Sequence, residues 1–119
     1  MKILVVDDSE SIRELLAITL ESAGYEVVKS NDGEDALLQI NKQEFRLVIT
    51  DLNMPKVDGI ELVKAIRSKE NLLGMPILLL TTESQANKKE EAKKAGATGW
   101  IIKPFAQDKL LSVVQKVTR

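Results

Sequence analysis

Short apolar runs alternate along the chain with longer segments whose apolar residues recur at helical spacing. Three runs are almost uniformly apolar, which is typical of strands buried on both faces of a parallel sheet. They occupy residues 2–6, 46–50 and 76–81. Residues 98–102 predict a further strand, and the more alternating residues 25–30 predict an outer one.

Each predicted strand is followed by a segment that favours a helix. The first follows Ser9 or Ser11, either of which can cap it, and Gly24 ends it. The others cover residues 33–42, 59–68, 84–95 and 107–117. Four of the five helices have an apolar face, whereas residues 84–95 are helical by propensity and offer only alanines for burial.

Five strand–helix units predict a doubly wound α/β fold with a five-stranded parallel sheet and right-handed crossovers. A length of 119 residues suits one domain, so we expect residues 1–119 to form it without an output domain. Nothing approaches the roughly 20 apolar residues of a membrane span, and no signal peptide is evident. We therefore expect a cytoplasmic protein that does not bind membranes.

Composition narrows the chemistry further. Lys and Arg number 17 against 18 Asp and Glu, so the chain lacks the basic surface that non-specific nucleic-acid binding requires. Cysteine and histidine are both absent, which excludes thiolate and imidazole as metal ligands or nucleophiles. The groups that remain available for binding or catalysis are carboxylates, hydroxyls, lysines and the backbone.

Polar side chains occur where the predicted strands end. Asp7 and Asp8 follow the first strand, Asp51 the third, Thr81 ends the fourth and Lys103 follows the fifth. In an open parallel sheet, ligands bind beyond the carboxyl ends of the strands, so these groups should meet at one edge. Each alone has a plainer interpretation, since a strand-end Asp often caps a helix.

Together these groups favour phosphoryl chemistry. Three carboxylates repel one another unless a cation lies among them, and an all-oxygen ligand set selects Mg²⁺. A metal, a lysine and a hydroxyl around a carboxylate suit a transferring phosphoryl group, which Asp51 would accept as nucleophile.

The motifs "VVDDS", "TDLNMPKVDG", "LLLTTES" and "AGATGWIIKPF" resemble those of two-component response regulator receiver domains over essentially the whole chain. The resemblance is greatest to the single-domain, CheY-like chemotaxis type. It implies a flavodoxin-like (βα)5 fold with strand order 2-1-3-4-5.

The resemblance also implies roles for individual residues. Asp51 corresponds to the phosphoacceptor, and Lys103 to the lysine that meets the phosphoryl group. The metal ligands would be Asp8, Asp51, the backbone carbonyl of Asn53 and, through water, Asp7. Thr81 corresponds to the switch hydroxyl, and Trp100 to an aromatic switch that is more usually Tyr or Phe. The bond between Lys103 and Pro104 is expected to be cis.

The resemblance further implies that the protein is a monomer. It would catalyse its own phosphorylation and dephosphorylation, without being a conventional enzyme. A histidine kinase would supply the phosphoryl group, and the output would be a protein contact, possibly with the flagellar motor switch. The fourth helix, the Trp100 strand and the last helix would form that contact.

Other interpretations stay open. A phosphorelay intermediate would pass the phosphoryl group to a histidine phosphotransfer protein, and a pseudo-receiver would act as a scaffold without phosphorylation. Haloacid-dehalogenase-like phosphatases also form an aspartyl phosphate, but they use a D-x-D motif after the first strand. The six glycines form neither G-x-G-x-x-G nor a P-loop, which disfavours a nucleotide-binding protein.

Overall fold

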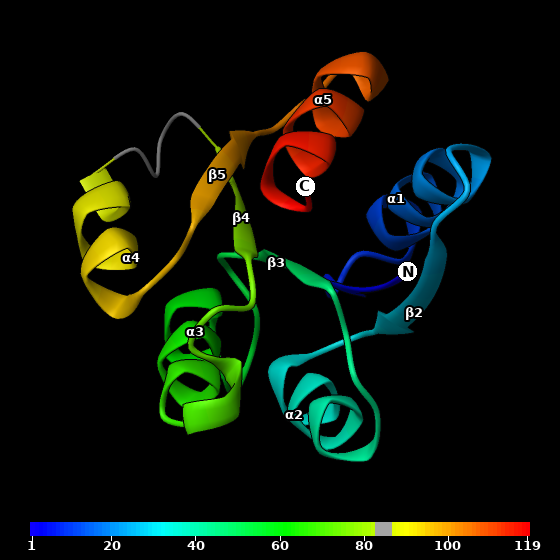
Figure 1. Cartoon of the computed structure of the whole chain (residues 1–119). Coiled ribbons are helices and arrows are strands. Elements are labelled where there is room, and N and C mark those ends of the chain that lie inside the picture. The colour runs from blue at the N-terminus through cyan, green and yellow to red at the C-terminus, as the bar shows by residue number, and fades with distance from the viewer. Residues whose placement is uncertain (83–86) are drawn as a thin grey trace.

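The computed structural model describes residues 1–82 and 87–119 (Figure 1). Across these residues, parallel strands form one sheet in the order β2-β1-β3-β4-β5. The strands are β1 (Lys2–Val6), β2 (Glu26–Ser30), β3 (Leu47–Asp51), β4 (Ile77–Thr81) and β5 (Gly99–Ile102). The helices are α1 (Glu10–Ser22), α2 (Gly33–Lys42), α3 (Gly59–Arg67), α4 (Lys89–Ala95) and α5 (Gln107–Val117), with a short 3-10 helix η1 (Glu70–Leu72). The doubly wound, flavodoxin-like fold and its strand order are confirmed.

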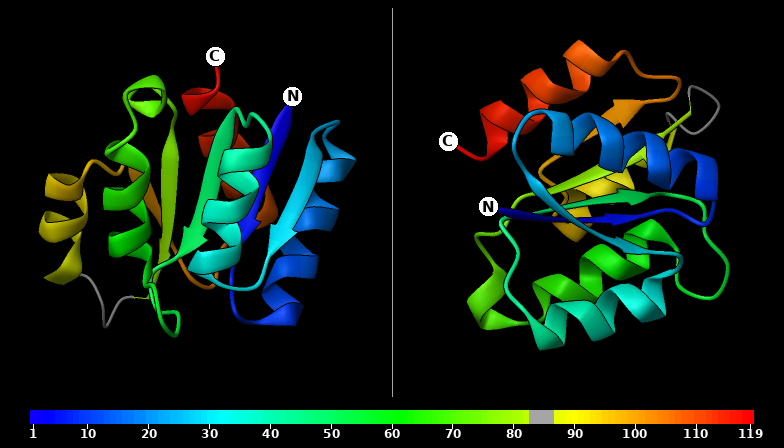
Figure 2. Two further views of the ribbon diagram at one scale, coloured as in Figure 1. Left: turned by 90° about the horizontal axis from the view of Figure 1, so that it is seen from below. Right: turned by 90° about the vertical axis from the view of Figure 1, so that its right-hand side faces the viewer.

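Helices cover both faces of the sheet. Helices α1 and α5 lie on one face, and α2, α3 and α4 lie on the other (Figure 2). Strand β2 is at one edge of the sheet, as its more alternating sequence predicts. None of the helices within the described ranges is long and apolar enough to cross a membrane.

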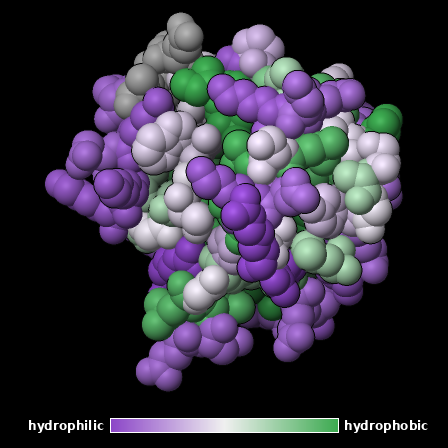
Figure 3. All heavy atoms as spheres, turned by 45° about the horizontal axis from the view of Figure 1, so that its top comes forward, coloured by the Kyte–Doolittle hydropathy of each residue, from purple (hydrophilic) through white to green (hydrophobic). Residues whose placement is uncertain are grey.

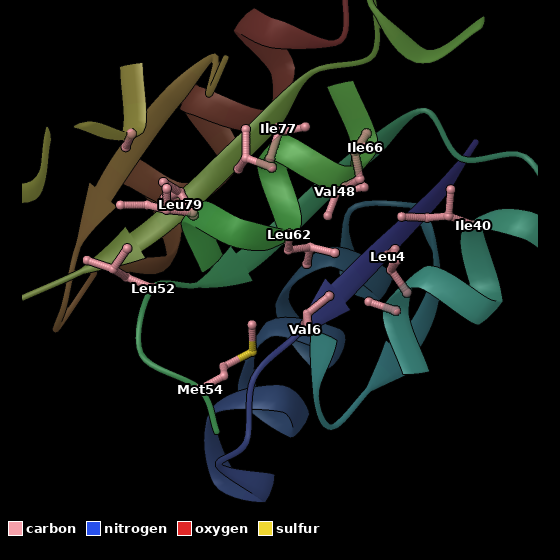
Figure 4. Packing of buried hydrophobic residues seen from close by; sticks show 14 of the residues in the cluster. Leu4, Val6, Ile40, Val48, Leu52, Met54, Leu62, Ile66, Ile77 and Leu79 are labelled. Atoms are coloured by element: carbon pink, nitrogen blue, oxygen red, sulfur yellow. The ribbon is translucent and has the colours of Figure 1, made fainter. Parts of the chain in front are cut away.

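Burial on both faces explains the uniformly apolar central strands. In β1, Leu4 and Val6 belong to the cluster beneath α2 and α3. Ile3 and Val5, which alternate with them, belong to the cluster beneath α1 and α5. Figure 4 shows the first cluster, in which Leu62 of α3 packs towards the strands. Because neither face of β1 meets water beyond Lys2, the rest of the strand has no polar residue.

Side-chain caps mark the starts of α1 and α3. Ser9, rather than Ser11, caps α1 by accepting a hydrogen bond from the Ile12 N–H. Asp58 caps α3 in a capping box with Glu61, in which each side chain accepts from the other residue's N–H. These caps satisfy N–H groups that the first turn of a helix leaves without an intrahelical partner.

Helix α4 differs most from the sequence-based prediction. We predicted a helix over residues 84–95, but the described helix begins at Lys89, and residues 84–86 lie outside the described part of the chain. Its N-cap, Lys88, makes no side-chain capping bond, and Ala92 is the buried residue of the helix. A helix start is poorly specified when neither a cap nor an apolar stripe marks it.

Strand β3 ends at Asp51, which confirms that this carboxylate lies at the carboxyl end of the third strand. Two smaller features differ from the prediction. Leu15 has the spacing of an inward-facing residue but is 37% exposed, because the sheet contacts Leu16 and Leu20 instead. The 3-10 helix η1 was not predicted, and it has no buried residue that could have produced an apolar signal.

Candidate functional site

Three carboxylates converge at the carboxyl edge of the sheet. Strands β1 and β3 are neighbours, which brings Asp7 and Asp8 beside Asp51. Their oxygens lie within 4.8 Å of one another. Asp7 and Asp51 are buried, whereas Asp8 is exposed to solvent. The topology therefore concentrates negative charge where a ligand of a parallel sheet would bind.

Lys103 is the counter-ion within this cluster. Its Nζ donates to Asp51 Oδ1 at 2.9 Å and to Asp7 Oδ2 at 3.2 Å. Burial alone would lower the pKa of Lys103, but the hydrogen bond to Asp51 and the charges of Asp51 and Asp7 outweigh it and raise the pKa. The amine is therefore held as an ammonium. The peptide bond that follows it, to Pro104, is cis.

Asp51 is in an environment that disfavours its charge. Burial, with the neighbouring negative charges of Asp7 and Asp8, raises the pKa of Asp51 even though the hydrogen bond and charge of Lys103 lower it. Lys103 therefore offsets only part of the effect of burial and of the two neighbouring acids on Asp51. A further cation in the cluster would favour the ionised carboxylate.

The loop between β3 and α3 is fixed at both ends. Met54 is buried and points from the loop back towards Val6 (Figure 4). At the other end, a Cβ on Gly59 would lie 2.5 Å from the Asp51 carbonyl oxygen and 2.9 Å from Leu52 Cα, so only glycine fits without a backbone shift. Asn53 is exposed within this loop, two residues beyond Asp51.

Thr81 and Trp100 lie on the same face of the sheet. Trp100 is paired with Leu79, two residues before Thr81 on β4. The Thr81 side chain is buried, yet its Oγ1 has no hydrogen-bond partner among the described residues. Trp100 is 36% exposed, and Lys89 Nζ lies 5.1 Å from the centre of its ring. A buried hydroxyl without a partner is costly, so the Thr81 hydroxyl is free to donate to a ligand that offers an acceptor atom.

The donor set fits a hard divalent cation. Carboxylate oxygens are the ligands that Mg²⁺ prefers, and the sequence has neither the imidazole of His nor the thiolate of Cys. Burial first, and then the charges of Asp7 and Asp8, raise the pKa of Asp51, and a bound cation would favour its ionised form. The acidic cluster can therefore hold a metal ion.

Comparison with known proteins decides the family. A model of the response regulator receiver domain matches residues 3–115. This chain belongs to that family. The receiver domain is 35% identical over 118 residues to the chemotaxis protein CheY of Pseudomonas aeruginosa, covering 98% of this chain and 95% of that protein.

Two Vibrio cholerae proteins are also similar to this receiver domain. Chemotaxis protein CheY-3 is 38% identical, with 98% of this chain and 91% of that protein covered. The solved structure of chemotaxis response regulator CheY4 is 48% identical with a TM-score of 0.93, over 98% of this chain and 97% of that chain. The receiver domain is thus CheY-like, which places it in two-component, phosphorylation-based signalling.

The sequence identified most of the residues that the receiver fold brings together, but it missed two neighbours. Arg13 donates from Nη1 to the Asp7 carbonyl oxygen at 2.6 Å, and Lys89 lies over Trp100. Arg13 falls one helical turn after Ser9, the cap of α1, and this spacing was the available signal. Nothing in the sequence marks Lys89 among the lysines of α4.

Proposed function

We propose that Asp51 accepts a phosphoryl group from a phosphohistidine on a sensor kinase, with Mg²⁺ as cofactor. The observation that carries this proposal is the placement of Asp51 between Lys103, at 2.9 Å, and two further carboxylates. Residues 1–119 include no histidine, so the phosphohistidine of the proposed reaction lies outside this domain.

In the proposed reaction, a carboxylate oxygen of Asp51 attacks the phosphorus atom. The bond from oxygen to phosphorus forms as the bond from phosphorus to the imidazole nitrogen breaks, and solvent supplies the proton that the imidazole takes up. The Lys103 ammonium offsets charge on the phosphoryl oxygens, and the Thr81 hydroxyl donates to one of them.

Asp8, Asp51, the backbone carbonyl of Asn53 and, through water, Asp7 would hold the Mg²⁺. When bound, the ion would neutralise the carboxylates and stabilise the charge on the phosphoryl oxygens. The surplus of acids over cations around Asp51 supports this assignment, because without a metal the incoming phosphoryl group would meet net negative charge.

We further propose a role in chemotaxis, in the cytoplasm, where the phosphorylated monomer binds the flagellar motor switch. The similarity to CheY proteins over nearly their full length supports this role. The partner surface would include α4, β5 and α5, where Trp100 is exposed and Ala92 is the buried residue of α4.

Incubation with acetyl phosphate and Mg²⁺ tests the phosphoacceptor. Mass spectrometry should detect one phosphoryl adduct on the parent protein, none on Asp51→Asn, and none on the parent when EDTA removes the metal. Asp108→Asn, which changes an exposed acid in the first turn of α5, is the matched control and should be phosphorylated normally. An adduct of equal yield on Asp51→Asn would refute the assignment.

A motor-switch role has its own test. The phosphorylated domain should bind a purified flagellar switch protein more tightly than the unphosphorylated domain does, as measured by fluorescence anisotropy. Equal affinity in the two states would leave the phosphoacceptor chemistry intact but exclude this output.

A further inference from the structure

Arg13 is a charged side chain beside the acidic cluster that the proposed reaction does not use. It lies on α1, and its Nη1 donates to the backbone carbonyl oxygen of Asp7 at 2.6 Å. Its own N–H donates to the Ser9 carbonyl at 3.0 Å. The side chain therefore reaches back across the segment that joins β1 to α1.

That segment carries two of the three acids and is fixed by few contacts. Asp7 N–H donates to the Ser30 carbonyl at 3.2 Å, and Ser9 N–H donates to Asp7 Oδ1 at 2.9 Å. Asp8, between them, is exposed, and its carboxylate makes no hydrogen bond to another described residue. The backbone of the segment thus decides where the Asp8 carboxylate points.

We infer that Arg13 is a positioning residue of the metal site. The Asp7 carbonyl and the Asp8 N–H belong to one planar peptide unit, so fixing the carbonyl oxygen fixes the orientation of that unit. The orientation in turn sets the direction of the Asp8 side chain. This inference rests on the proposed function, because it assumes that Asp8 binds Mg²⁺.

The hydrogen bond and the positive charge of Arg13 should have opposite effects on Mg²⁺ affinity, which makes the inference testable. The guanidinium is a positive charge beside a cation site, so removing the charge alone would strengthen Mg²⁺ binding. Losing the hydrogen bond would weaken binding, because groups that orient metal ligands typically account for about tenfold or more in affinity. The sign of the change therefore separates the two effects.

The experiment titrates Mg²⁺ into the full chain and follows backbone amide shifts by NMR. Arg13→Met, which removes both donor and charge, should bind Mg²⁺ about tenfold more weakly than the parent. Arg13→Lys, which keeps a charged donor, should bind more tightly than Arg13→Met despite its repulsive charge. Arg46→Met is the matched control: Arg46 Nη2 also donates to a backbone carbonyl, that of Thr118 at 2.8 Å, but near the start of β1 at the opposite edge of the sheet.

Two results would overturn the inference. One is Mg²⁺ affinity in Arg13→Met equal to or greater than that of the parent, and the other is affinity in Arg13→Lys no greater than in Arg13→Met. Failure of the proposed metal site gives a different result, because the parent itself would then show no saturable Mg²⁺ shifts. Asp8→Ala serves as the reference for a lost ligand.

Discussion

Binding of a phosphoryl mimic at Asp51 should move Trp100. The perturbation is a beryllium fluoride complex added with Mg²⁺, which offers acceptor atoms near the end of β4. Thr81 Oγ1 is buried, has no partner within residues 1–82 and 87–119, and can donate to such an acceptor by moving inward. Trp100 lies on the same face of the neighbouring strand and can fill the vacated volume by changing rotamer.

The interaction energies favour inward movement of the Trp100 ring. One hydrogen bond to a charged group is worth about 1.5–3 kcal/mol, which corresponds to a change of about ten- to a hundredfold in the ratio of inward to outward rings. Lys89 opposes the movement, because a cation over an aromatic ring near the protein surface is worth about 0.5–1 kcal/mol. The new hydrogen bond should therefore outweigh the contact with Lys89.

Fluorescence reports this step directly, since Trp100 is the only tryptophan in the sequence. We expect its emission to change on addition of the mimic, and Thr81→Ala to lose most of the change. Lys89→Met should shift the unliganded spectrum towards the activated one, whereas Lys93→Met, an exposed lysine on the same helix, should not. An unchanged emission spectrum, with binding of the mimic demonstrated by NMR, would refute the coupling.

Three substitutions test stability by thermal and denaturant unfolding. Gly59→Ala should lower the free energy of unfolding by about 1–3 kcal/mol, because its Cβ would overlap backbone atoms of Asp51 and Leu52. Gly74→Ala, whose Cβ would meet no atom within 4 Å, should have little effect. Equal effects of the two substitutions would contradict the close-approach argument. Asp58→Ala should cost about 0.5–2 kcal/mol by removing the capping box of α3, and an unchanged unfolding midpoint would show that the cap contributes nothing. Asp51→Asn should raise the midpoint in the absence of Mg²⁺, because burial raises the pKa of Asp51 and its ionised form therefore destabilises the native state at neutral pH. Mg²⁺ should then stabilise Asp51→Asn less than the parent, and an equal Mg²⁺ shift in both proteins would argue against Asp51 as a ligand.

Figure 3 shows one reason why partner surfaces are harder to predict than cores. The face that includes α5 presents hydrophobic side chains scattered among hydrophilic ones, with no broad apolar area in that view. Ile18 on α1, for example, is 62% exposed. Periodicity marks a residue as apolar, but it does not tell whether the sheet or the solvent lies opposite.

The sequence by itself determined the order of the elements and most of the site. Uniform apolar runs such as β1 can only be buried on both faces, and parallel strands bring their carboxyl ends to one edge. The convergence of Asp7, Asp51 and Lys103 follows from those two facts. The cap that Asp58 forms at the start of α3 depends only on residues of its own segment.

Only the tertiary structure decided the contacts between side chains that no local pattern relates. Three features depend on what packs opposite each residue: the start of α4 at Lys89, the exposure of Leu15, and the lack of a partner for the Thr81 hydroxyl in the described part of the chain. The pKa of Asp51 likewise depends on its burial and on its distances from charged residues at two other strand ends. Local propensity and periodicity act over a few residues, whereas burial, charge proximity and hydrogen-bond satisfaction are set by neighbours that are distant in the sequence.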